Sequence, residues 1–233
     1  MSLYLGNKKV APAVYIKEGE TFGIPIEMFI GFKDENGVLQ RSTDYFNITF
    51  QNIETIGYNC FNGLFRNFLI NQISFGSIKE IQDYGFYAAF DGNSYLSSVE
   101  MPNVEKIGDY GLFSCFYQCR FQNIDFPKLK YIGAHGLDGC FTRCFNLVSV
   151  GFSALEEIQD RGLYNAFPNC TGITKISFPS LIKVVDFSLY NAFNGCTNLT
   201  EIHFRSDMQE TISALTGYAD KWGATNATIY FDL

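Results

Sequence analysis

Hydrophobic residues recur along most of this chain with a period of 25 or 26 residues. The clearest column consists of phenylalanines at this spacing: Phe65, Phe90, Phe116, Phe141, Phe167 and Phe193. A second column, of aliphatic residues, precedes each phenylalanine and continues past the last: Ile48, Ile73, Val99, Ile124, Val150, Ile176, Ile202 and Ile229. A period between about 20 and 50 residues is typical of solenoid proteins. The pattern therefore predicts one elongated stack of similar units.

Within one unit the hydrophobic pattern changes from an alternating to a helical one. Ile176 and Phe178 flank the polar Ser177, which predicts a short strand with one buried face. After an irregular turn, hydrophobic residues fall at positions i, i+3, i+4 and i+7: Leu189, Ala192, Phe193 and Cys196. That spacing predicts a short helix. The expected fold class is α/β, a curved solenoid of strand, turn and short-helix units with a parallel sheet.

The repeat occupies residues 47–204, and no linker interrupts it. Residues 1–46 lie outside the period. Alternating residues and an Asn-Gly pair over residues 26–42 predict a β-hairpin that covers the open N-terminal end of the stack. The alternative is a separate binding domain, although a segment of about 45 residues is marginal for independent folding.

Residues 205–233 also depart from the period and predict a C-terminal capping unit. Met208, Ile212 and Leu215 share one face of a short helix, and residues 227–231 read as a last strand. The three regions together are expected to form one elongated domain.

Charge and hydropathy argue against nucleic-acid binding and against insertion into a membrane. The net charge of −7 gives no basic footprint for nucleic acid. No apolar segment reaches the length of a transmembrane helix, and the start of the chain lacks a signal-peptide pattern. We therefore expect no nucleic-acid partner and no membrane insertion, while the cellular location and the oligomeric state stay open.

Seven cysteines invite a metal or disulfide interpretation. Two pairs with equal spacing would supply four thiolates to a zinc ion: Cys115, Cys119, Cys140 and Cys144. All four lie on the predicted helix face, where other units carry Ala, Phe or Asn. The odd number and the repeat spacing favour buried, reduced thiols that pack as small hydrophobic residues.

Candidate catalytic residues are few. The chain has two histidines, His135 and His203, and it contains neither a Gly-x-Ser-x-Gly elbow nor a phosphate loop. Since nucleophilic catalysis needs a nucleophile beside a base and an orienting group, we predict no enzyme, no catalytic residue, no metal and no cofactor.

Polar positions between the buried strand residues offer the best candidate for binding. On a curved solenoid these outward residues line the concave wall, where partners are commonly bound. The candidate binding residues are Ser74, Ser98, Glu100, Asn123, Asp125, Ser149, Lys175, Ser177, Glu201 and His203. The alternative is a merely solvated face. A group of tyrosines near the predicted helix starts either packs between coils or forms a second surface for protein or carbohydrate: Tyr84, Tyr87, Tyr110, Tyr164 and Tyr190.

Several segments resemble the BspA-type class of leucine-rich repeats. They are Ile-Gly-Asp-Tyr at 107–110, Phe-Pro-x-Leu-x-x-Ile at 126–132 and Ala-Phe-Asn-Gly-Cys-Thr-Asn-Leu-Thr-Glu-Ile at 192–202. The tail at 222–231 is similar to the ends of such proteins from gut bacteria and their prophages. The units here are longer than the usual unit of that class.

This resemblance implies a leucine-rich-repeat solenoid used for surface attachment or protein recognition, without a shared catalytic residue. It implies a bacterial cell surface or a phage particle as the setting, and a protein as the partner. A glycan ligand and a purely structural part of a phage tail or surface assembly are the alternatives.

Overall fold

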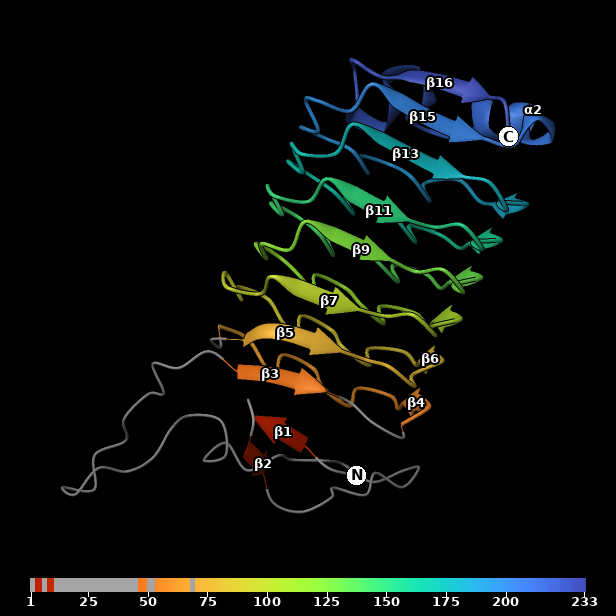
Figure 1. The fold of residues 1–233 in the computed structure, drawn as a ribbon. Helices are drawn as coiled ribbons and strands as arrows, with labels where there is room; N and C mark the ends of the chain where they lie inside the picture. Colours follow the sequence, from red (N-terminus) through yellow and green to blue (C-terminus); the bar gives the residue numbers. More distant parts are fainter. Residues whose placement is uncertain (1–2, 6–7, 11–45, 50–52, 68–69) are drawn as a thin grey trace.

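The computed structural model describes residues 3–5, 8–10, 46–49, 53–67 and 70–233. The repeats form a stack of similar coils that follow one another along the axis of the molecule (Figure 1). The coils before the C-terminal end contribute one strand to each of two sides of the stack and then a run of tight turns. This arrangement is the solenoid that the period predicts.

Two short strands lie before the repeats. Strand β1 (Leu3–Leu5) pairs antiparallel with β2 (Lys8–Val10). The hairpin predicted over residues 26–42 lies outside the described residues.

On one side of the stack lies a row of parallel strands that follow one another from coil to coil, and we call this row the first sheet (Figure 1). Backbone pairing divides it into three groups, of three, two and three strands in chain order. Its strands are β3 (Phe46–Thr49), β5 (Ile70–Ser74), β7 (Ser98–Glu100), β9 (Asn123–Asp125), β11 (Ser149–Gly151), β13 (Lys175–Phe178), β15 (Glu201–Phe204) and β16 (Thr228–Phe231). The register aligns Ile176 with Ile202 and Ile202 with Ile229, so neighbouring coils align at the repeat period. From Ile73 to Ile202, the second predicted column is buried.

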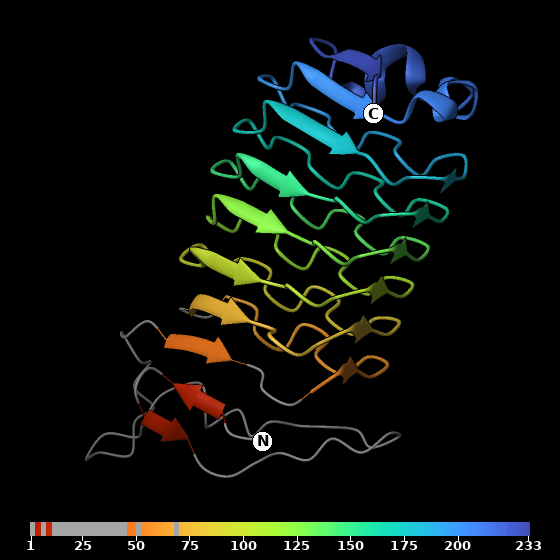
Figure 2. The ribbon, with the colours of Figure 1, turned by 45° about the vertical axis from the view of Figure 1, so that its right-hand side comes forward.

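A second parallel sheet runs along another side of the stack (Figure 2). Its two-residue strands are β4 (Thr55–Ile56), β6 (Glu80–Ile81), β8 (Lys106–Ile107), β10 (Tyr131–Ile132), β12 (Glu157–Ile158) and β14 (Lys183–Val184). In each strand the first side chain lies toward solvent, and the second is a buried Ile or Val. The sequence pattern predicts an irregular turn for this segment, because two residues are too few to show a hydrophobic alternation.

The helix predicted in each unit is wrong. In the described coils, the segments with the i, i+3, i+4, i+7 pattern are runs of turns, in which every fourth residue has a left-handed backbone. One coil shows this at Tyr110 (φ 55°), Ser114 (φ 47°) and Gln118 (φ 60°). A right-handed helix has negative φ at every residue, so these positions exclude it.

Hydrogen bonding between coils explains the left-handed residues. Alternate backbone N–H groups donate to the next coil, as Leu112 does to Gly136 O (2.9 Å) and Phe116 to Cys140 O (2.9 Å). Each N–H group between them donates to the carbonyl three residues earlier in the same coil, as Cys115 N does to Leu112 O (3.1 Å). The predicted apolar residues are therefore buried, but their spacing of three and four comes from linked turns rather than from a helix.

The helical elements in the described residues lie at the C-terminal end, where the sequence also predicts a helix. They are the 3₁₀ turn Ser206–Met208, helix α2 (Gln209–Ser213) and the 3₁₀ segment Tyr218–Gly223. Met208 and Ile212 are buried there, as the pattern indicates. Strand β16 follows at the position predicted for the last strand.

The phenylalanine column forms the centre of the core. All six rings are buried, and each stacks nearly parallel on the ring of the next coil. Centroids are 5.2 Å apart between Phe141 and Phe167, and 5.9 Å apart between Phe116 and Phe141. Such distances are typical of offset stacking, which adds about 0.5–1.5 kcal/mol per pair to the gain from burial.

Candidate interaction surface

The ten predicted binding residues all lie on strands of the first sheet. They flank the buried central residue of each strand, so they occupy its outward face. The register aligns Asn123 with Ser149, Lys175 with Glu201, and Ser177 with His203. Sequence reasoning therefore placed these side chains in their correct columns.

The middle of this face carries polar groups without internal partners. Within the described part of the chain, the exposed side chains of Asn123, Asp125 and Ser149 form neither hydrogen bonds nor ion pairs. Asp125 lies against Gly151 of the next coil, because a Cβ built on Gly151 would be 1.9 Å from Asp125 Oδ1. The missing side chain at Gly151 therefore makes room for this carboxylate on the face.

In the N-terminal part of the face, polar side chains pair with one another: Ser74 Oγ donates a hydrogen bond to Glu100 Oε2 at 3.0 Å. At the other end, Lys175 Nζ lies 3.3 Å from Glu201 Oε2. These pairs hold side chains across neighbouring coils, so they organise the two ends of the face more tightly than its middle.

His203 is enclosed, although it lies on the outward side. Its ring stacks on Tyr230 with centroids 4.7 Å apart, and its residue is 6% exposed. Nε2 is 3.0 Å from Glu201 Oε2, and Nδ1 is 2.8 Å from Asp232 Oδ1. The hydrogen bond from His203, followed by that from Lys175, lowers the pKa of Glu201. With both ring nitrogens engaged, this imidazole has no free nitrogen to act as a base.

His135 lies far from His203, on the turn side of the stack. Its Nδ1 is 2.7 Å from Asp138 Oδ2, and its ring stacks on Tyr110. Burial raises the pKa of Asp138, an effect that the hydrogen bond to His135 opposes. The structure therefore does not bring the two histidines together. Nor do three or more His, Cys, Asp or Glu residues gather around a metal position in the described ranges.

The cysteines form a ladder of hydrogen-bond donors in the core. Four thiols, those of Cys119, Cys144, Cys170 and Cys196, each donate to the carbonyl of a column phenylalanine in the preceding coil. The distance is 3.0 Å from Cys144 to Phe116 O and 2.9 Å from Cys170 to Phe141 O. All seven cysteines are free. Burial raises the pKa of Cys144 and of Cys196 to about 12, which keeps these donors protonated. The geometry gives the buried thiols a role that the sequence analysis described only as packing.

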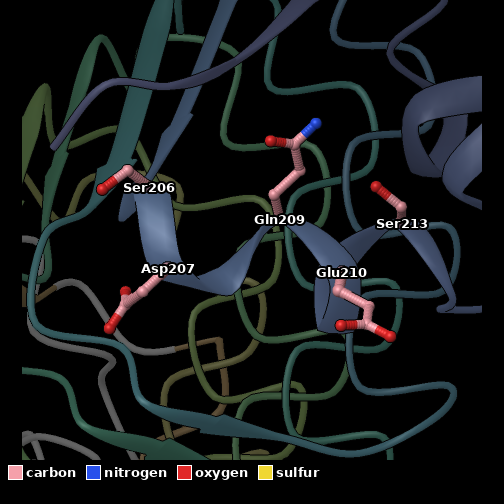
Figure 3. Close-up of a pocket in the computed structure, with 5 residues that line it drawn as sticks. All are labelled: Ser206, Asp207, Gln209, Glu210 and Ser213. Atoms are coloured by element: carbon pink, nitrogen blue, oxygen red, sulfur yellow. The ribbon is translucent and has the colours of Figure 1, made fainter.

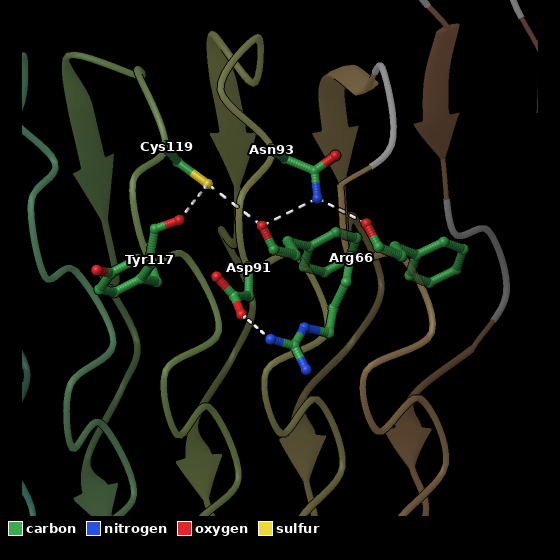
Figure 4. A network of polar contacts seen from close by, with 7 residues as sticks. Arg66, Asp91, Asn93, Tyr117 and Cys119 are labelled. Atoms are coloured by element: carbon green, nitrogen blue, oxygen red, sulfur yellow. Dashed lines mark hydrogen bonds and ion pairs between the residues drawn. The ribbon is translucent and has the colours of Figure 1, made fainter.

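One coil uses an amide in place of the thiol (Figure 4). Asn93 Nδ2 donates to Phe65 O at 2.6 Å and to Phe90 O at 2.9 Å, whereas its buried Oδ1 has no hydrogen-bond partner. Beside it, Cys119 Sγ donates to Phe90 O at 3.5 Å. The asparagine therefore preserves the ladder but leaves one buried acceptor unsatisfied.

We expect Asn93→Cys to raise the free energy of unfolding by about 1 kcal/mol, because a thiol supplies the donor without the unsatisfied oxygen. Asn93→Ala is the matched control, since it removes both groups and leaves Phe65 O without this donor. Urea denaturation of the two variants and the parent chain measures the effect. A cysteine variant less stable than the parent would contradict this explanation of the ladder.

The second sheet carries charges that neutralise one another. Salt bridges join neighbouring coils along it, for example Lys106 to Glu80 (2.8 Å) and Lys183 to Glu157 (3.0 Å). A parallel row includes Lys79 paired with Glu54 at 3.1 Å. These rows of salt bridges were not predicted, although Glu and Lys that alternate at the repeat period are visible in the sequence. Because most of these charges have a partner within the chain, this face is a weaker candidate for binding than the first sheet.

A shallow polar hollow of about 460 Å³ lies at the C-terminal end of the stack. The lining residues are Ser206, Asp207, Gln209, Glu210 and Ser213 (Figure 3). Arg205 holds Asp207 through two hydrogen bonds, of 2.9 and 2.6 Å, which lower the pKa of that carboxyl group. In Figure 3 the Gln209 side chain points away from Asp207 and Glu210. The lining groups therefore do not converge on one position, as a ligand site would require.

A membrane-spanning helix is absent from the described segments, since none of their helices is long and apolar enough.

Comparison with known families agrees with the architecture. The family model of the BspA type leucine rich repeat region matches in six copies, over residues 35–115, 55–190 and 112–215. A search of the curated proteins gives no match. Leucine-rich repeats are generally non-enzymatic and generally mediate protein–protein interaction. The chain belongs to the BspA-type leucine-rich repeat family, which supports its assignment as a repeat-based protein-interaction or surface module.

Proposed function

We propose that this chain is a non-enzymatic recognition module that binds a protein partner through the outward face of its first sheet. The observation that supports this assignment is the unpartnered polar group in the middle of that face, formed by Asn123, Asp125 and Ser149. Polar groups that the chain leaves unpaired can exchange water for a partner's hydrogen bonds, whereas the paired charges of the second sheet must first be separated.

The proposal extends to the setting and the organisation of the chain. The family favours a bacterial cell surface or a phage particle, where such a module would attach to a target protein. Within the chain, residues 47–204 would present the binding face, while residues 1–46 and 205–233 would cover the ends of the stack. End coverage matters because an uncapped solenoid exposes core residues to solvent.

A binding screen tests the proposal. The purified chain is offered to immobilised extracellular-matrix proteins, mucins and a glycan array, beside the variant Asn123→Ala/Asp125→Ala/Ser149→Ala. We expect a protein ligand whose affinity falls by about tenfold or more in the variant, since a central set of contacts is removed together. Unchanged thermal unfolding of the variant shows that the loss is local.

Glu105→Ala is the matched control. It removes one negative charge, as the triple variant does, but Glu105 lies beside β8 on the second-sheet side. We expect it to leave binding unchanged. Binding that survives in the triple variant would reject the first sheet as the binding face. Absence of any ligand at micromolar protein would favour a purely structural component, and a glycan hit would favour the alternative ligand class.

A further inference from the structure

The described part of the chain contains two Asn-Gly pairs, at 62–63 and 194–195, and a third at 36–37 lies outside it. Such a pair is chemically reactive, because the backbone nitrogen that follows an asparagine can attack its side-chain amide carbon. Glycine favours this attack, since it has no side chain to shield the nitrogen or to restrict the backbone. In a folded chain, the reaction depends on whether a hydrogen bond holds that nitrogen.

Gly195 occupies a repeat position whose N–H group elsewhere bonds to the following coil. In the earlier coils this residue has a left-handed backbone, and its N–H donates at 2.7 to 3.0 Å: Asn67, Gly92, Gln118, Arg143 and Asn169. Gly195 has the same backbone, with φ 76°. Its N–H group, however, has no acceptor within the described residues.

The C-terminal segment explains this free N–H group. Trp222 takes the place of a following coil, because its carbonyl accepts the N–H of Phe193 at 3.0 Å. The acceptor for Gly195 would come two residues later, at Ala224. The carbonyl of Ala224 instead accepts the N–H of Ala227 at 2.8 Å. The stack therefore ends one hydrogen bond short at Gly195.

The Asn194 side chain is open to reaction as well. It is exposed, and its amide forms no hydrogen bond within the described ranges. The pair at 62–63 differs on both counts, although Asn62 is also exposed. Gly63 N donates to Tyr87 O at 2.8 Å, and Asn62 Nδ2 donates to Asn59 Oδ1 at 2.8 Å. The chain thus contains a reactive pair and a protected one.

We propose that Asn194 is a site of spontaneous deamidation, and that its isoaspartyl product loosens the C-terminal end of the solenoid. The reagents are water and base, so the reaction needs no enzyme. The site is independent of the proposed binding face, and its test does not involve a ligand.

The reaction has two steps. Base removes the proton of Gly195 N, which attacks Asn194 Cγ; the Cγ–Nδ2 bond then breaks, and ammonia leaves. The resulting cyclic succinimide takes up one water at either of its carbonyl carbons. Opening at Cγ gives aspartate, whereas opening at the backbone carbonyl gives isoaspartate, in which the main chain runs through Cβ and Cγ. The isoaspartyl chain is one methylene longer at this point.

The surroundings of Asn194 leave little room for a longer main chain. A Cβ built on Gly223 would lie 2.7 Å from Asn194 Cα, so the C-terminal segment packs directly on this backbone. Asn194 O accepts the N–H of Asn169 at 2.7 Å. Cys196, which follows the pair, is buried and donates from Sγ to Phe167 O at 3.1 Å. Lengthening the chain between these fixed contacts must displace some of them.

Peptide mass spectrometry of the full chain tests the site during incubation in mildly alkaline buffer. Replacement of the amide NH₂ by OH gives a mass gain at each modified asparagine, and the same chain in denaturing guanidinium chloride gives the unprotected rates. We expect the ratio of folded to denatured rates to be at least about fivefold higher at Asn194 than at Asn62, because Gly63 must first release its hydrogen bond.

Two variants control for the chemistry and for the charge of the product. Asn194→Gln disfavours ring closure through its longer side chain, so we expect position 194 to stay unmodified while Asn62 reacts as in the parent. Asn194→Asp carries the charge of the product on an ordinary main chain. After chromatographic separation of the isoaspartyl form, we expect its amide exchange in β15 and β16 to be about tenfold or more faster than in Asn194→Asp. Strand β9 is expected to keep its protection in both.

Three outcomes would overturn the proposal. Equal protection of Asn194 and Asn62 in the folded chain would show that the free N–H group does not control the reaction. An Asn194 that stays intact while Asn62 reacts would reject the site. An isoaspartyl form that exchanges like Asn194→Asp would show that the C-terminal end accommodates the longer main chain.

Discussion

Phe141→Ala is expected to lower the free energy of unfolding by about 3–5 kcal/mol, the usual effect of removing a buried aromatic ring. Phe141 is fully buried and stacks between Phe116 and Phe167, with Phe121 meeting it edge-on at 6.2 Å. The alanine variant leaves a cavity in the middle of the stack, and the rings on both sides lose a partner. Urea denaturation followed by circular dichroism measures the change.

Phe145→Ala is the matched control, four residues further along the same coil. Its ring is 56% exposed, so we expect a change within about 0.5 kcal/mol. Near-equal effects of the two substitutions would mean that the phenylalanine column does not carry the cohesion of the stack.

Trp222→Ala is expected to open the C-terminal end of the solenoid. The indole is fully buried, contacts Phe204 edge-on at 6.0 Å, and donates from Nε1 to Thr216 O at 3.1 Å. Its carbonyl accepts the N–H of Phe193 at 3.0 Å, in the place where a following coil would accept it. Removing the ring costs about 3–5 kcal/mol of local stability, which corresponds to at least about 100-fold faster amide exchange in β15 and β16.

Hydrogen exchange also tests how far this opening spreads. Each coil of a solenoid contacts mainly its neighbours, so β9 and β11 are expected to keep their protection. Leu233→Ala, at a position that is 47% exposed, is the control and should leave exchange unchanged. Uniform loss of protection from β5 to β16 in Trp222→Ala would show that the stack unfolds as one cooperative unit.

The left-handed residues on the turn side have an energetic explanation. Tyr84, Tyr110, His135, Arg161 and Phe187 all have φ between 52° and 60°, a region that costs a non-glycine residue roughly 1–2 kcal/mol. The N–H of each of the first three donates to the following coil; for example, Tyr110 N donates to Ala134 O at 2.9 Å. Ring stacking between the coils adds to this gain. Contacts between coils therefore offset a cost that a single coil could not sustain.

The same contacts connect the fold to recognition. Because coils align residue by residue, each position of the repeat becomes a column on the surface, and neighbouring columns carry different chemistry. The first sheet presents small polar groups, the second sheet presents paired charges, and the turn side presents aromatic rings. The proposed binding face is the place where a column offers polar groups that the chain does not itself pair.

The sequence by itself determined the parts of this protein that repeat along the chain. The period of 25 or 26 residues identified a solenoid, and the buried columns at Phe141 and Ile176 fixed which side chains form its core. Alternation around Ile176 also gave the first sheet and the columns of its outward residues. These features follow from side-chain burial alone, which a hydrophobic pattern records directly.

The tertiary structure decided where the backbone hydrogen bonds go. Buried residues spaced three and four apart fit a helix. In the structure, however, N–H groups such as that of Leu112 donate to the next coil, and this pairing requires a left-handed backbone at every fourth residue. The second sheet and the enclosure of His203 by Tyr230, Glu201 and Asp232 likewise depend on partners about 25 residues away or on the last strand. A local pattern contains no information on such partners, because the contacts exist only once the coils are stacked.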